Sequence, residues 1–203
     1  MLKPVLPDKL NPDLIFNQLD PQVQQWIKRV VVLPEVSSTN QYLIENPRLY
    51  LAIAEKQHAG RGQKGRVWYS PQEQNIYLSV RWLNQVRQDI TPINLLVAEA
   101  IKKLCIELSI QDLVIKPPND LMIAGKKAAG ILIEATTQAD QVNLIIGVGI
   151  NVWMHSVPDQ AIDQPWTSLS HEVPKGLLNS PKFNRNWLIS RFLNILYYEL
   201  EVF

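Results

Sequence analysis

Short runs of β-branched and apolar residues alternate along this chain with helical patterns, and that order constrains the fold more than any other feature of the sequence. The predicted strands cover residues 30–33, 49–55, 75–82, 113–115, 130–135 and 142–150. One short helical pattern follows Ser37–Asn40, a second opens at Thr91-Pro92, and the last runs from Trp187 to Leu200. Strands and helices mixed in this order predict an α+β (mixed α/β) fold, a single domain with a mixed β-sheet backed by helices.

The clearest strand is followed by the clearest helix. Residues 75–82 alternate, with apolar side chains on one side and a second side that carries Asn75, Tyr77, Ser79 and Arg81. Such alternation is typical of a strand with one buried and one exposed face. After Thr91, a proline at the first helical position and apolar residues at helical spacing predict an amphipathic helix. Cys105 lies on its apolar stripe, and we expect it to be a core thiol.

Length and composition indicate one globular domain. A chain of 203 residues commonly forms one domain of roughly 100–200 residues, and we expect residues 1–29 to be an N-terminal leader or small helical cap before a domain at 30–203. Twenty basic and nineteen acidic residues leave a net charge of +1, which argues against a protein built mainly to bind nucleic acid or a membrane. A single cysteine excludes an internal disulfide framework, and we expect neither a signal peptide nor a membrane helix. These features predict a cytoplasmic protein.

The densest functional signal is the glycine-rich segment Gly60–Arg66, called the glycine loop below. It satisfies the pattern G-x-G-x-x-G, but a dinucleotide site needs a helix after the glycines, and Val67-Trp68-Tyr69 is typical of a strand. Glycines let backbone amides approach a phosphate, and Arg61, Lys64 and Arg66 add positive charge at the same place. The segment is therefore either an anion-binding loop or a solvated hairpin loop.

Three further segments are candidates for a ligand site. Lys116–Asp120 holds polar groups around two prolines, but Asn-Asp is also an ordinary turn sequence. Gly125–Gly130 places Lys126 and Lys127 before a strand that ends at Glu134, for contact either with an anionic ligand or with solvent. Gly147–Asn151 has two strand glycines, which indicate close packing by a ligand or by the protein itself.

The histidines do not predict a metal site. His58, His155 and His171 lack metal-ligand spacing. Ser170-His171 lacks the surroundings of a hydrolase nucleophile. We therefore expect no protein-bound metal centre and no hydrolase triad.

Taken in order, the motifs resemble the catalytic domain of biotin–protein ligases over about residues 30–170. The resemblance rests on Ser38-Thr39-Asn40, Gln57 with Gly60–Arg66 and Trp68, Ser70-Pro71, Asn75–Ser79, Lys116–Asp120, Lys127–Glu134 and Gly147–Asn151. It implies that residues 30–203 form a ligase catalytic domain that uses ATP and Mg²⁺ to make biotinyl-5′-adenylate. The biotinyl group is then transferred to a lysine of a biotin carboxyl carrier protein, as in acetyl-CoA carboxylase.

The resemblance also implies roles for particular residues. Lys127 and Arg61 correspond to catalytic residues. The implied biotin contacts are Ser38, Thr39, Asn40, Gln57, Gly60, Arg61, Gly62, Gln63, Lys127, Gly130, Gly147 and Gly149. The implied ATP contacts are Arg61, Lys64, Arg66, Lys116, Asn119, Asp120, Asn151 and Trp166.

The chain departs from the family pattern at two positions. Pro117 stands where the family commonly has tryptophan, and Gln63 stands where the glycine loop usually carries a basic residue. The lost charge predicts a protein that either forms the adenylate but releases it more readily than its relatives, or is slow. The N-terminal helix-turn-helix and the C-terminal small β-barrel of many members are not expected, so the family implies no nucleic-acid partner here, while a homodimer is possible.

Two other functions remain open on the sequence. One is a catalytically impaired module that binds biotin or its adenylate, and the other is a related lipoate or octanoate transferase.

Overall fold

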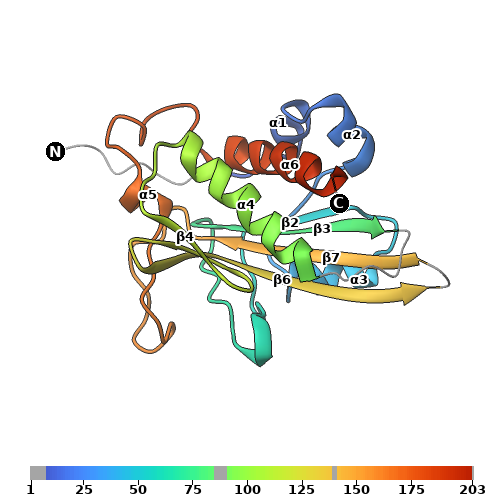
Figure 1. Ribbon diagram of the computed structural model, residues 1–203, viewed down its shortest axis with the longest axis horizontal. Coiled ribbons are helices and arrows are strands. Elements are labelled where there is room, and N and C mark those ends of the chain that lie inside the picture. Colours follow the sequence, from blue (N-terminus) through green and yellow to red (C-terminus); the bar gives the residue numbers. More distant parts are fainter. Residues whose placement is uncertain (1–7, 85–90, 139–140, 203) are drawn as a thin grey trace.

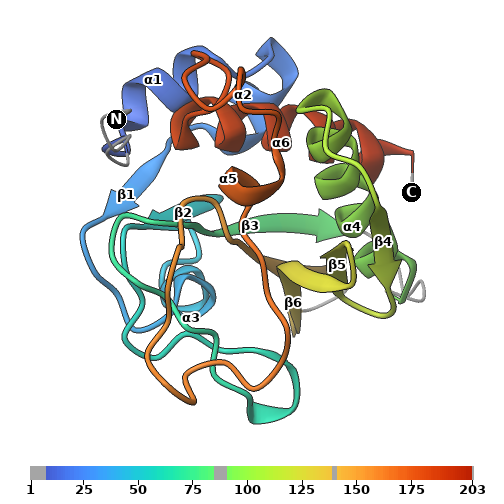
Figure 2. The same cartoon turned by 90° about the vertical axis from the view of Figure 1, so that its left-hand side faces the viewer.

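The computed structural model describes residues 8–84, 91–138 and 141–202. Its centre is a mixed seven-stranded sheet with the order β1-β2-β3-β7-β6-β5-β4. Helices α1, α2, α4 and α6 cover one face, and α3 lies on the other (Figures 1 and 2). This arrangement confirms the predicted mixed sheet backed by helices.

Most of the observed strands are longer than the segments predicted for them, and one further strand is present that was not predicted. Their bounds are β1 Val31–Leu33, β2 Leu51–Ala54, β3 Ile76–Asn84, β4 Leu113–Lys116, β5 Asp120–Ile123, β6 Lys126–Gln138 and β7 Gln141–Ile150. Among the strands of the described residues, β1 and β2 alone pair in parallel, and the other neighbours are antiparallel. The sequence did not predict β5, which pairs Asp120 with Gly130 of β6. The expected turn between β6 and β7 includes residues 139–140, which lie outside the described residues.

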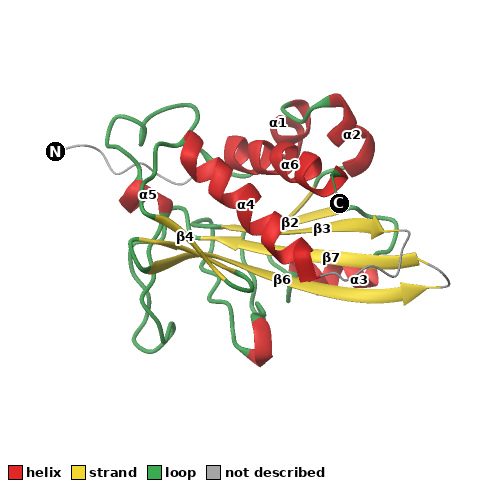
Figure 3. Cartoon of the chain, viewed as in Figure 1, coloured by secondary structure: helices red, strands yellow, loops and turns green. Residues whose placement is uncertain are grey.

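Helices α3, α4 and α6 correspond to the three predicted helical patterns, whereas α5 was not predicted (Figure 3). Their bounds are α1 Pro12–Asn17, α2 Pro21–Ile27, α3 Thr39–Glu45, α4 Thr91–Glu107, α5 Leu169–Glu172 and α6 Arg185–Glu201, with a short 3₁₀ turn η1 at Gln63–Gly65. Asn11 begins α1 by accepting hydrogen bonds from the backbone of Asp13 and Leu14, before a proline at the first helical position. In the described part of the chain, no helix combines the length and apolar character required to span a bilayer.

The prediction that β3 is half exposed is wrong. Tyr77, Ser79 and Arg81 are as buried as the apolar residues between them. Helix α3 and its C-terminal loop cover this second face, and Arg81 donates to the carbonyl oxygens of Leu43 and Leu49. Ser79 and Arg81 thus hydrogen-bond to α3 and this loop, and Tyr77 Oη donates to Pro71 O at 2.9 Å, so these polar residues alternate along β3 without facing water.

The glycine loop also differs from its prediction. Val67-Trp68-Tyr69 is not a strand: Val67 forms one isolated bridge with Arg61, and Trp68 N donates to Gly60 O at 2.9 Å. The loop closes on itself at η1 and does not lead into an α-helix. The exclusion of a dinucleotide-binding loop therefore holds, although the segment after the glycines is irregular.

The main core lies between the sheet and helices α4 and α6. Cys105 is fully buried there, and burial raises the pKa of its thiol to about 12. The predicted core thiol is confirmed, and it stays protonated and unreactive at neutral pH.

A buried arginine joins the N-terminal segment to the sheet. Arg185, at the start of α6, has no exposed surface; its Nη1 donates to Glu55 Oε2 at 2.6 Å, and its backbone N donates to Asp8 at 2.9 Å. The other Glu55 oxygen accepts from Leu10 N at 2.9 Å. Residues 8–10, β2 and α6 thus meet at one charge network.

We predict that Arg185→Ala lowers the free energy of unfolding by about 3–5 kcal/mol, because it leaves the Glu55 carboxylate buried without its partner. Arg191→Ala is the control, since Arg191 pairs with Glu107 at the surface and its loss costs about 1 kcal/mol or less. Urea titrations of the two variants measure the difference. Equal losses would show that Arg185 acts as an ordinary surface charge.

Candidate functional site

A pocket lies on the face of the sheet that carries α3. The glycine loop and the loop between β7 and α5 hang on this side of the sheet (Figure 2), and both contribute to the lining. The cavity volume is about 270 Å³. Its walls come from α3, strands β3, β6 and β7, and these two loops, so the tertiary fold brings together segments more than a hundred residues apart.

The indole ring of Trp68 forms the floor of the pocket. A Cβ added at Gly130 would lie 2.8 Å from Trp68 Cζ3, and one at Gly149 would lie 2.6 Å from Trp68 Nε1. The two glycines therefore allow the indole ring to lie directly on β6 and β7. Lys127 Nζ lies 5.3 Å from the centroid of the same ring, within cation–π range.

One end of the pocket is uncharged and rich in hydrogen-bonding groups. Ser38 and Thr39 line this end at the start of α3, and Gln57 Oε1 accepts from Thr39 N at 2.9 Å. Gln57 Nε2 donates to Ser70 Oγ at 3.2 Å, which fixes the amide. The carbonyl and hydroxyl oxygens at this end are suited to a neutral polar ligand group.

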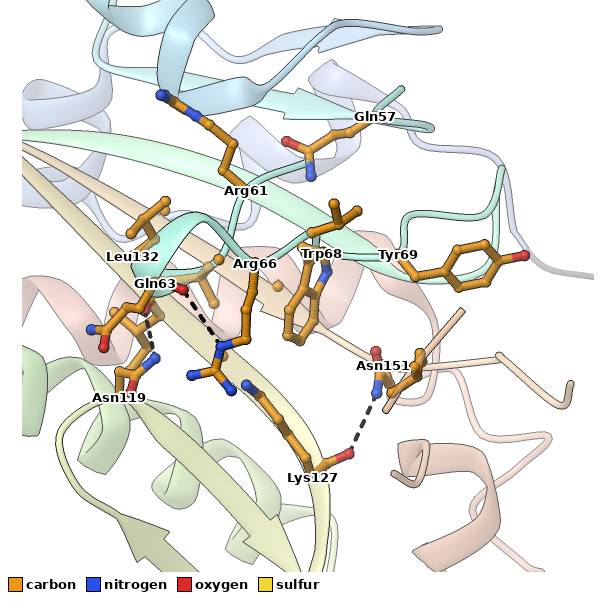
Figure 4. Close-up of a pocket in the computed structure, with 18 of the residues that line it drawn as sticks. Gln57, Arg61, Gln63, Arg66, Trp68, Tyr69, Asn119, Lys127, Leu132 and Asn151 are labelled. Carbon is orange, nitrogen blue, oxygen red and sulfur yellow. Dashed lines mark hydrogen bonds between the residues drawn. The ribbon is translucent and has the colours of Figure 1, made fainter. Parts of the chain in front are cut away.

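The other end is cationic. Figure 4 shows Arg66 and Lys127 pointing into the same part of the pocket, whereas Arg61 points away from both of them. Lys127 Nζ pairs with Asp120 Oδ1 at 2.8 Å, with side chains only 11% and 10% exposed. Arg61 Nη2 instead pairs with Glu134 Oε2 at 2.9 Å. A partly dehydrated lysine beside an arginine is a site for a ligand anion.

Backbone pairing places the remaining predicted residues around Lys127. Lys127 N donates to Pro165 O, and Thr167 N donates to Lys127 O, so Trp166 lies in a bridge beside the lysine. Asn151 Nδ2 donates to Thr167 O at 3.0 Å, and its backbone N donates to Ala128 O at 2.9 Å. These contacts explain how Trp166, distant in sequence, reaches the cationic end.

Most of the residues predicted for the site line this one pocket. They are Ser38, Thr39, Asn40, Gln57, Arg61, Gly62, Gln63, Arg66, Asn119, Lys127, Gly130, Gly147, Gly149, Asn151 and Trp166. Gly60, Lys64, Lys116 and Asp120 are not part of the lining. Lys64 and Lys116 are exposed, Gly60 packs behind Trp68 and Ser70, and Asp120 is paired with Lys127.

Sequence reasoning missed three contributors. Trp68 and Glu134 belong to the motifs that carry the resemblance but were given no contact role, and the lining segment 160–164 was given none either. The glycines at positions 130 and 149 held a signal for a closely packed group, but not for its identity. Only the fold shows that Trp68 is that group.

The described residues contain no group of three or more His, Cys, Asp or Glu side chains that could hold a metal ion. His155 Nδ1 and His171 Nε2 lie 2.9 Å apart, and burial, aided by His155 and Lys126, lowers the pKa of His171. His171 is thus neutral at pH 7, and a hydrogen bond between two rings accounts for the contact.

The pocket is suited to one elongated ligand. Neutral hydrogen-bonding groups lie at one end, apolar side chains of Leu78, Ile131 and Val148 lie along the lining, and two cations lie at the other end. Such an arrangement fits a molecule with a polar neutral head, an apolar stem and an anionic terminus.

Comparison with known proteins gives the same family from sequence and structure. Residues 32–151, more than half of the chain, match the biotin/lipoate A/B protein ligase family. The chain is 34% identical over 200 residues to the bifunctional ligase/repressor BirA of Salmonella typhimurium and, equally, to that of Escherichia coli. These alignments cover 96% of this chain but 58% of each relative, so the chain spans little more than half of their length.

A solved structure resembles the fold over most of its length. It is the biotin protein ligase from Aquifex aeolicus in complex with biotin and ATP, with a TM-score of 0.71 and 27% identity. The match covers 86% of this chain and 71% of that chain.

We predict that Gly149→Ala lowers the free energy of unfolding by about 1–3 kcal/mol, because the new methyl group overlaps the Trp68 ring. Gly176→Ala is the control, since an added Cβ there meets nothing within 4 Å. Both are measured by urea unfolding, with Gly149→Ala repeated in a Trp68→Ala background. A penalty that persists without the indole would contradict the assigned contact.

Proposed function

The chain belongs to the biotin/lipoate A/B protein ligase family, and from that premise we propose that it is a biotin–protein ligase. In the first step, a biotin carboxylate oxygen attacks the α-phosphorus of ATP, and the bond to pyrophosphate breaks. In the second, the amine of a carrier lysine attacks the acyl carbon of biotinyl-5′-adenylate, AMP leaves, and the amine loses a proton as the amide forms.

The observation that carries this proposal is the polarity of one pocket. The neutral end at Thr39 and Gln57 suits a ring urea, which has both N–H donors and a carbonyl acceptor. The apolar lining suits the aliphatic tail, and the end at Lys127 and Arg66 suits a carboxylate next to a phosphate.

Lys127 is the proposed catalytic residue. Negative charge increases on the phosphoryl oxygens during the first step, and a fixed ammonium in a partly dehydrated site stabilises it. The ammonium already contacts Asp120 and the Trp68 ring, so little reorganisation is needed. Sharing the ammonium between Asp120 and the ligand avoids leaving either charge buried alone.

Arg61 is proposed as a second donor to the anionic end. Its Nη2 is held by Glu134, and the side chains of this pair are 42% and 28% exposed. Exchanging such an exposed partner for a phosphate or carboxylate costs only about 0–1 kcal/mol. Asn151 and Trp166 are proposed to contact the nucleotide, beside the bridge at Lys127.

Mg²⁺ is proposed to enter with the nucleotide. The ion usually keeps several waters and binds substrate phosphates with one or two carboxylates, without a dedicated protein cage. The donors among the described residues agree with this mode, since they form no cluster able to hold a metal alone.

The proposed partner is a biotin carboxyl carrier protein, which supplies the accepting lysine. A cytoplasmic location is proposed because the sequence has a single cysteine and therefore no internal disulfide of the kind common in oxidising compartments. A homodimer and the lack of a nucleic-acid partner stay predictions.

We predict that biotin, ATP and Mg²⁺ together allow this protein to add one biotinyl group to a carrier-domain lysine, detected by mass spectrometry. Lys127→Ala should lower the rate at least about a hundredfold, by removing the charge nearest the reacting phosphate. Lys126→Ala is the control, because that neighbouring lysine is exposed and does not line the pocket.

The same assay separates the alternatives. Modification by lipoate or octanoate but not biotin would identify an acyl transferase. A biotin-dependent rise in melting temperature with no carrier modification would identify a binding module.

We further predict that Gln63→Arg slows dissociation of biotinyl-adenylate. Gln63 lines the pocket, and a charge-assisted contact at this position is worth roughly 1–3 kcal/mol, or about five- to 150-fold in rate. Lys64→Ala, at the exposed neighbouring position, is the control. Slow dissociation from the unaltered protein that is unchanged by Gln63→Arg would contradict the prediction.

A further inference from the structure

A continuous row of side chains links the neutral end of the pocket to Glu134. Ser79 Oγ lies 2.7 Å from Thr39 Oγ1 and 2.5 Å from Asn40 Oδ1. Asn40 Nδ2 lies 2.8 Å from Glu134 Oε2, and the same carboxylate oxygen accepts from Arg61 Nη2 at 2.9 Å. The row therefore runs from Thr39 through Ser79 and Asn40 to a carboxylate.

Gly147 provides the space for this row. Ser79 of β3 pairs with Gly147 of β7, which in turn pairs with Leu132 of β6. A Cβ at Gly147 would lie 2.9 Å from Asn40 Cγ, so the Asn40 amide lies directly on β7 and extends across it from β3 to β6.

The orientation of the Asn40 amide follows from its partners. Its Nδ2 faces Leu132 O at 3.2 Å and Glu134 Oε2, and both of these are acceptors only. The amide nitrogen must therefore point to β6, which leaves Oδ1, an acceptor, toward Ser79. Both amide hydrogens are used within the protein.

The direction of the remaining hydrogen bonds is then fixed. Ser79 has one hydroxyl proton, and Asn40 Oδ1 cannot donate, so Ser79 donates to Asn40. The contact between the two hydroxyls consequently requires Thr39 to donate to Ser79. Gln57 Oε1 lies further from Thr39 Oγ1, at 3.2 Å, and already accepts from Thr39 N.

We propose that Glu134 is a positioning residue for the neutral head of the substrate. Together with Leu132 O, its carboxylate accepts from the Asn40 amide and so directs each hydrogen bond back to Thr39, whose hydroxyl then offers only lone pairs to the pocket. Thr39 thereby selects a ligand group that donates an N–H, as a ring urea does. This inference rests on the proposed function. It also gives roles to Ser79, which links Thr39 to Asn40, and to Gly147, which leaves room for the Asn40 amide.

Biotin binding in the absence of ATP tests the proposal by calorimetry. Glu134→Met keeps the bulk but removes the terminal acceptor, and we expect about tenfold or weaker affinity, the factor that corresponds to roughly 1.4 kcal/mol. Glu134→Gln keeps a carbonyl acceptor for Asn40 and should bind within about threefold of the unaltered protein. Glu107→Met removes a surface carboxylate paired with Arg191 and serves as the control.

A double variant distinguishes this role from a general loss of structure. Because Glu134 acts through Thr39, Glu134→Met should cost no further affinity in a Thr39→Val background. Unchanged binding by Glu134→Met, or full additivity with Thr39→Val, would overturn the inference alone. Failure of the unaltered protein to bind biotin would overturn this inference and the proposed function together.

Discussion

The close approach of side chains to the sheet at three glycines is the constraint on which the pocket depends. Asn40 lies on β7 at Gly147, and Trp68 lies across β6 and β7 at Gly130 and Gly149. With a Cβ at any of these positions, the indole or the amide would have to move. The glycines thus set both the depth of the pocket and the positions of the groups at its two ends.

A second constraint is the pairing of charge at low exposure. Lys127 and Asp120 form a nearly buried pair whose dehydration is costly, and burial of such a pair seldom improves stability by itself. A lysine kept in this state interacts strongly with an incoming anion, since little water screens it. The Lys127–Asp120 pair therefore contributes to the pocket more than to stability. A second buried pair, Arg185 with Glu55, joins the N-terminal segment to α6 and β2.

Local patterns predicted much of the fold. Apolar periodicity located α4, α6 and most strands, because each of these elements buries a regular face. It failed where polar residues are buried by a distant segment: Ser79 and Arg81 alternate along β3 as solvent-facing residues would, yet α3 and its C-terminal loop satisfy them. It also missed β5, a short strand held by pairing with β4 and β6.

The sequence by itself determined most of the elements, the candidate motifs and the type of chemistry, since glycines, lysines and amides have the same capabilities wherever they lie. The tertiary structure alone decided which of them meet. It directed Arg66 and Lys127 into one end of the pocket, paired Arg61 with Glu134, left Lys64 and Lys116 at the surface, and made Trp68 the floor. Distances between side chains depend on strand register and loop closure, which bring together residues far apart in the chain and leave no local pattern in it.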